Sequence, residues 1–131
     1  MNELLNPDKM TGADLAYLGD AVMELMTREK LLASGVTDVG RLNKLALSYV
    51  RAVAQSEAVE RVLPLLSEEE AEVFRRGRNA HGISAPKSAS TVEYRRATGL
   101  EALFAWLWLR GEDDRRRALF AAAYPENAEG N

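Results

Sequence analysis

The chain has 131 residues, 47% of them hydrophobic and 28% charged, which suits one soluble domain with a buried core. It has no cysteine, which excludes disulfides and thiolate metal sites and favours a reducing cytoplasm. The N-terminus lacks a signal-peptide pattern, and the longest apolar run, residues 100–109, is too short to span a bilayer. We therefore expect a cytoplasmic protein with no membrane partner.

The net charge of −3 is unevenly distributed along the chain. Residues 75–96 carry six basic side chains and one acidic side chain, a local charge of +5, which leaves −8 for the rest of the chain. A basic segment on an acidic body is typical of a surface that binds a polyanion. On charge alone, a mixed solvated surface explains the pattern equally well.

The first predicted elements are a short opening helix and a long central helix. Asn6-Pro7 fits an N-cap followed by proline at the first helical position. Residues 11–14 predict the capped start of the central helix, which reaches about Ala33 and stops at Gly35. Its apolar residues recur at helical spacing and predict the buried stripe: Leu15, Leu18, Val22 and Leu25.

A third helix is predicted from residues 37–38 to just before Pro64, with a break near Ser56. Two Ser-x-x-Glu capping boxes, at residues 67–70 and 90–93, predict the starts of the next two helices.

Those two helices are expected to end near Gly77 and Gly111, with an exposed loop over residues 79–89 between them. A last helix is predicted from about Asp113 to Ala123. No alternating strand pattern is present, so the prediction is an all-α single domain over residues 1–131, with an ordered core of about 6–124.

Asp20 is the first candidate functional residue because it lies in the central helix, opposite the predicted apolar stripe. Its neighbours on that face include Ala13, Ala16 and Tyr17, so the face is mostly small and apolar. A carboxylate buried there must be hydrogen-bonded, paired or bound to a cation. We interpret Asp20 as a ligand of a divalent metal, with Glu101 as its partner.

Glu101 lies in the most apolar predicted helix, with Ala97, Thr98 and Ala105 on its face. The usual alternative for a single helical glutamate is a position facing solvent. Two carboxylates on small-residue helix faces are the minimal protein contribution to a Mg²⁺ site, because Mg²⁺ keeps several of its waters. His81, the only histidine, excludes multi-histidine zinc and iron sites, and we expect it to be solvated or to face RNA.

Arginines at residues 75–78 could mark only the end of a helix, with Gly77 as a left-handed cap. That reading does not explain their density or the second pair, Arg95 and Arg96. If the loop between them folds back, the two clusters would flank one opening suited to phosphates.

Three segments of the chain resemble the ribonuclease III catalytic domain, and specifically its short subfamily, Mini-ribonuclease III. They are residues 17–22 (YLGDAV), 75–80 (RRGRNA) and 94–103 (YRRATGLEAL), and the similarity runs from about Leu15 to Tyr124. The resemblance implies an all-helical homodimer that cuts double-stranded RNA with Mg²⁺, or with Mn²⁺ as a substitute, and has no separate RNA-binding domain. It further implies maturation of the large-subunit (23S) ribosomal RNA precursor, and a ribosomal protein is a possible helper in this reaction.

The resemblance also implies roles for individual residues. Asp20 matches the family's catalytic aspartate and Glu101 its metal-binding glutamate. The positions that match regions expected to grip RNA are Arg75, Arg76, Arg78, Asn79, Lys87, Arg95 and Arg96.

This sequence departs from full-length ribonuclease III where that family has glutamates or an aspartate and this chain has Ala13, Ala16 and Thr98. Fewer carboxylates argue against a second metal held by protein ligands alone, and the short subfamily shares this difference. Two alternatives stay open: a non-catalytic RNA-binding helical dimer on the same scaffold, and a purely structural helical dimer whose basic segment is a solvated face.

Overall fold

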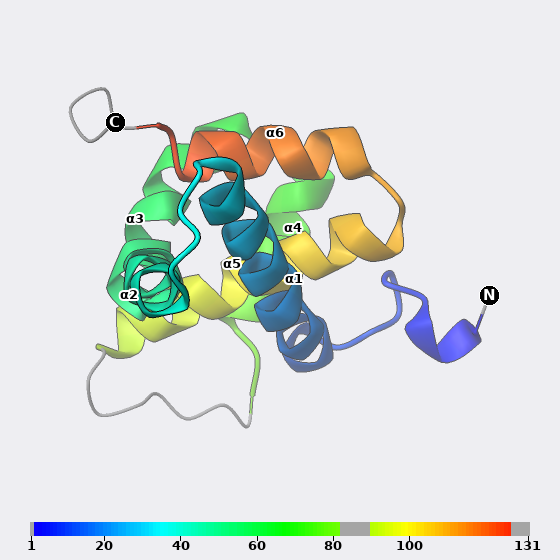
Figure 1. The fold of residues 1–131 in the computed structure, drawn as a ribbon. Coiled ribbons are helices and arrows are strands. Elements are labelled where there is room, and N and C mark those ends of the chain that lie inside the picture. The colour runs from blue at the N-terminus through cyan, green and yellow to red at the C-terminus, as the bar shows by residue number, and fades with distance from the viewer. Residues whose placement is uncertain (1, 82–89, 127–131) are drawn as a thin grey trace.

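The computed structural model describes residues 2–81 and 90–126, and within them every regular element is a helix (Figure 1). Their order along the chain is η1 (Glu3–Leu5), α1 (Gly12–Ala33), α2 (Val39–Val50), α3 (Ala52–Val62), η2 (Leu63–Leu65), α4 (Glu68–Arg78), α5 (Thr91–Leu109) and α6 (Asp113–Ala123). The all-α prediction is confirmed. No helix within the described ranges is long and apolar enough to cross a membrane.

Helix α5 forms the centre of the fold, and α1, α3, α4 and α6 all pack against it (Figure 1). Its residues 97–107 are almost all buried because apolar side chains occur on every face of this part of the helix. Helix α5 starts at the predicted capping box, in which Ser90 accepts from the backbone N–H of Glu93 at 3.0 Å. The predicted box at Ser67 starts α4 in the same way.

The structure corrects four details of the predicted elements. The opening helix is a 3₁₀ turn at residues 3–5, capped by Asn2, and Asn6 instead accepts from the N–H of Asp8 at 3.0 Å. The break in the third predicted helix lies at Arg51 and not near Ser56, so two helices form.

In α1, Leu25 is 46% exposed, and Met23 and Met26 are buried in its place. The buried face is therefore rotated from the predicted stripe. Helix α4 continues to Arg78, and Gly77 is not a left-handed cap, because the only described glycines with positive φ are Gly35 and Gly111.

An ion pair between a buried glutamate and a partly exposed arginine joins α4 to α6. Glu70 is buried, and both of its carboxylate oxygens accept from the Arg115 guanidinium at 2.8 Å. Hydrogen bonding from Arg115 lowers the pKa of the Glu70 carboxyl, although burial acts in the opposite direction. This carboxylate is satisfied within the fold.

Helices α1 and α5 cross at Gly19, where their backbones come into direct contact. A Cβ atom at this position would lie 2.9 Å from Cα of Glu101 and closer still to the Glu101 carbonyl oxygen. Only glycine fits at this distance. The contact brings residue 20 of α1 beside residue 101 of α5.

We expect Gly19→Ala to lower the free energy of unfolding by about 1–3 kcal/mol, because the added methyl group forces the two helices apart. Urea unfolding of the variant and the parent protein measures the difference. The matched control is Gly40→Ala in α2, where the nearest atom to a new Cβ is 3.7 Å away. The control should be neutral or up to about 1 kcal/mol more stable, and equal losses in both variants would contradict the crossing argument.

Candidate active site

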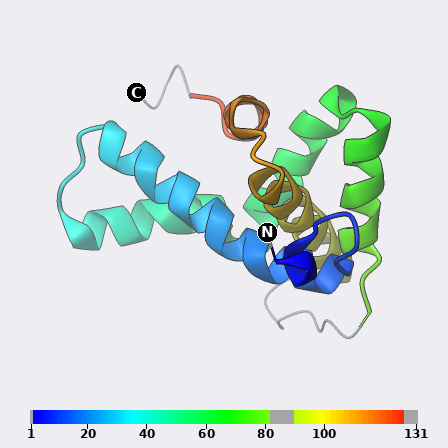
Figure 2. The same cartoon turned by 90° about the vertical axis from the view of Figure 1, so that its right-hand side faces the viewer.

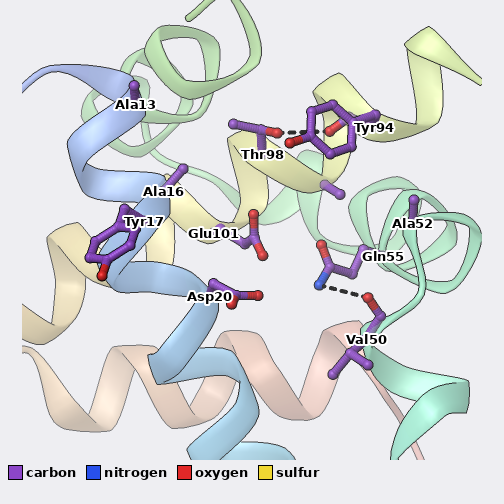
Figure 3. A pocket seen from close by; sticks show the side chains of 11 residues that line it. Ala13, Ala16, Tyr17, Asp20, Val50, Ala52, Gln55, Tyr94, Thr98 and Glu101 are labelled. Carbon is purple, nitrogen blue, oxygen red and sulfur yellow. Dashed lines mark hydrogen bonds between the residues drawn. The ribbon is translucent and has the colours of Figure 1, made fainter. Parts of the chain in front are cut away.

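A pocket of about 480 Å³ opens beside the crossing of α1 and α5. Side chains of α1, α2, α3 and α5 surround this region (Figure 3). Its lining residues are Ala13, Ala16, Tyr17, Asp20, Val50, Ala52, Gln55, Tyr94, Ala97, Thr98 and Glu101. The pocket contains both predicted metal ligands and most of the small neighbours that the sequence placed beside them.

Asp20 of α1 and Glu101 of α5 extend side by side into the pocket, with their carboxyl groups close together (Figure 3). Asp20 is exposed at the pocket mouth, whereas Glu101 is largely covered. Among the salt bridges of the described residues, none involves either carboxyl group. The described part of the protein therefore brings two acids together without supplying a cationic partner.

The pKa of Glu101 is shifted in the opposite direction to that of Glu70. Burial, followed by the hydrogen bond and like charge of Asp20, raises the pKa of the Glu101 carboxyl to about 9, while Gln55 opposes the shift. A carboxyl with so high a pKa holds a proton at neutral pH unless another cation replaces it. The donor set therefore fits a hard divalent cation, which prefers carboxylate oxygens.

The three positions that differ from full-length ribonuclease III also line the pocket: Ala13, Ala16 and Thr98. The Thr98 hydroxyl donates to the Tyr94 carbonyl of its own helix at 2.9 Å. In the described part of the chain, no cluster of three or more His, Asp or Glu side chains could hold a metal. Carboxylate ligands for a cation in this pocket are thus limited to two.

The basic residues meet where α4 ends and α5 begins. Arg95 donates to the carbonyls of Arg78 and Ala80, at 3.1 and 3.4 Å, which brings the two predicted clusters side by side. Arg78 also donates to Asn79 at 3.2 Å. Arg95 follows Tyr94, which lines the pocket, so this basic surface lies beside the end of the pocket that Tyr94 forms.

Other members of the predicted RNA-binding set have partners within the fold. Arg76 donates to the Met10 carbonyl at 3.0 Å and thereby holds the segment before α1 against α4. Arg75 pairs with Glu72 at 2.8 Å, and Arg96 pairs with Glu60 at 2.5 Å. Lys87 lies outside the described residues.

Sequence reasoning missed Gln55. This side chain of α3 lines the pocket opposite the two acids and is only 2% exposed. No motif or charge pattern marks it, because a single glutamine in a helix normally faces solvent. The predicted break near Ser56 also placed it at the end of a segment instead of within a packed helix.

Comparisons with known proteins identify relatives of the chain in sequence and in fold. The family model described as "Ribonuclease III domain" matches residues 13–112. A protein named Mini-ribonuclease 3 from Symbiobacterium thermophilum is 46% identical over 120 residues, covering 92% of each chain. Another protein of that name, from Desulfitobacterium hafniense, is 47% identical over 107 residues, covering 82% of this chain and 68% of its own.

A solved crystal structure of a Fusobacterium nucleatum protein has a similar fold. It aligns with a TM-score of 0.81 at 29% identity and covers 90% of this chain and 96% of its own. The agreement extends over nearly the whole helical array.

We expect the metal-free protein to become less stable as pH rises from about 5 to 9. The folded state keeps the Glu101 proton up to a pKa of about 9, whereas the unfolded chain releases it near 4.5, so the folded state binds more protons in this interval. Urea unfolding in EDTA at about pH 5.5 and about pH 8.5 measures the change. Glu101→Gln cannot ionise and should have a smaller pH dependence, and equal slopes in the two proteins would refute the shift.

Proposed function

This chain belongs to the ribonuclease III family of endoribonucleases, and from that premise we propose that it cuts double-stranded RNA in a Mg²⁺-dependent reaction. Its substrate in this proposal is the precursor of the large-subunit (23S) ribosomal RNA, whose ends it matures in the cytoplasm. The observation that carries the proposal is the pair of facing carboxyl groups, Asp20 and Glu101, in a pocket without a cationic partner.

Asp20 and Glu101 are the residues that would hold Mg²⁺, or Mn²⁺ in its place. Mg²⁺ typically takes one or two carboxylates and keeps several waters, and the pocket volume of about 480 Å³ leaves room for them and for a phosphate group. Such an ion supplies charge neutralisation at the scissile phosphate and lowers the pKa of a bound water. Asp20, at the exposed mouth of the pocket, would also help to orient the attacking water.

The basic surface at the junction of α4 and α5 would bind the RNA backbone. Arg78 and Arg95 lie together there, next to the pocket, and we retain Arg75, Arg76, Asn79, Lys87 and Arg96 in the proposed RNA-binding set. Contacts to phosphates give affinity that falls with salt and reads little sequence. This is the mode expected for duplex RNA, which proteins recognise mainly by shape.

We propose that the protein works as a homodimer that pairs through α1 and α2. These two helices project from the rest of the fold as an arm (Figure 2). Tyr17, Leu25 and Leu32 recur along one side of α1 and are 87%, 46% and 59% exposed. A groove of about 160 Å³, lined largely by apolar residues of α1 and α2, lies on the same arm. A second copy would cover this apolar surface and bring two sites to one duplex.

Asp20→Asn should abolish cleavage, with a loss of at least about a thousandfold, because the amide removes a charged oxygen from the site. The assay incubates a long perfect RNA duplex with the protein in Mg²⁺ and in EDTA. Binding of the uncut duplex, measured by gel shift, should change little.

The matched control is Asp14→Asn, which changes an exposed aspartate on the same helix outside the pocket. It should cut at the parent rate. Full cleavage by Asp20→Asn would exclude the proposed role, and duplex binding without any Mg²⁺-dependent cleavage by the parent would favour the non-catalytic scaffold. Precursor 23S ribosomal RNA, tested beside an unrelated duplex, addresses the substrate.

Leu25→Lys should weaken the dimer at least about tenfold, because it buries an unpaired charge at an apolar interface. Analytical ultracentrifugation over a concentration series measures the dissociation constant. Leu65→Lys is the matched control, since Leu65 is a similarly exposed leucine in η2, away from the arm. A parent protein that is monomeric at every concentration would disprove pairing through α1 and α2.

A further inference from the structure

Gln55 presents a buried amide oxygen that has no hydrogen-bond partner. Its side chain is 2% exposed and lines the pocket from α3. The amide nitrogen donates to the Val50 carbonyl at 3.4 Å, and Oε1 is one of two buried side-chain polar atoms without a partner among the described residues. The other, Nε of Arg116, does not belong to this pocket.

The Val50 carbonyl determines which way the amide points. Turning the amide over would place two oxygens against each other and lose the hydrogen bond from the nitrogen. The oxygen is therefore directed away from Val50, and both the oxygen and the nitrogen of the amide lie on the side of the two acids (Figure 3).

A buried polar atom without a partner carries its full desolvation cost. A leucine of similar size at this position would avoid that cost. This cost is explained if the Gln55 oxygen has a partner whenever the site holds a cation.

We propose that Gln55 is a third oxygen donor of the cation site, and that its Oε1 helps Asp20 and Glu101 to hold the hydrated divalent ion. This inference rests on the metal dependence proposed above. An amide suits the position because it adds an oxygen without adding a third negative charge beside two carboxyl groups that already repel each other. Residues that support the primary ligands commonly change metal affinity by 10–100-fold.

The test uses two substitutions and two measurements on the whole protein without RNA. Mn²⁺ affinity is measured by electron paramagnetic resonance of the free ion, and stability is measured by urea unfolding in EDTA. We expect Gln55→Leu to bind Mn²⁺ about tenfold more weakly, while its stability in EDTA is unchanged or higher, because the unpaired oxygen is gone.

Gln55→Glu keeps the shape of the side chain and adds a charge. It should bind Mn²⁺ more tightly than the parent protein and be less stable in EDTA. This variant keeps the test decisive if Gln55→Leu does not fold. Glu57→Leu is the control, because it changes an exposed side chain of α3, the helix that carries Gln55, outside the pocket and should leave Mn²⁺ affinity unchanged.

Parent-like Mn²⁺ affinity in Gln55→Leu, or lower stability in EDTA with unchanged affinity, would show a structural role and overturn the inference. Affinity in Gln55→Glu no higher than that of the parent would also overturn it. If the parent protein binds no Mn²⁺ and cuts no RNA, both the proposed function and the inference about Gln55 fail. If the parent does both and only the Gln55 results differ from expectation, the inference alone fails.

Discussion

The backbone contact between α1 and α5 at Gly19 is the constraint on which the candidate site depends. Each acid lies on a helix face of small residues, but neither helix alone forms the site. The helices approach so closely that Gly19 lies against the backbone of Glu101, and the next residue of α1 then faces the Glu101 carboxyl. The positions of the two acids are therefore fixed by the way in which α1 and α5 cross. A change in that crossing would move the two carboxyl groups relative to each other.

Two glutamates with little solvent exposure, one in α4 and one in α5, show how surroundings determine the role of this type of side chain. Glu70 accepts from Arg115 and has a lowered pKa, so it links α4 to α6 and needs nothing more. Glu101 faces a second acid and has a pKa raised to about 9. The charged form of the Glu101 carboxyl does not stabilise the fold. Its position is therefore better explained by binding of a cation than by a structural role.

Much of the fold could be predicted from the sequence because capping boxes and apolar periodicity are local signals. They located the starts of α4 and α5 and the extent of α1. Asp20 and Glu101 could be chosen as partners because each is an acid on a face of small residues. The rotated stripe of α1, the break at Arg51 and the burial of Gln55 depend on how helices pack, and no local pattern encodes them. Arg76 illustrates the same limit, since its bond to Met10 joins segments far apart in the chain.

In the proposed homodimer, the projecting arm would link the stability of this protein to its concentration. The part of α1 beyond the crossing and the facing part of α2 line a groove, and none of the α2 side chains is fully buried. An arm of this kind gains much of its burial only when something covers it, so folding of the arm and association obey one mass-action equilibrium. In dilute solution the arm would open first, while the tightly packed helices around α5 stay intact.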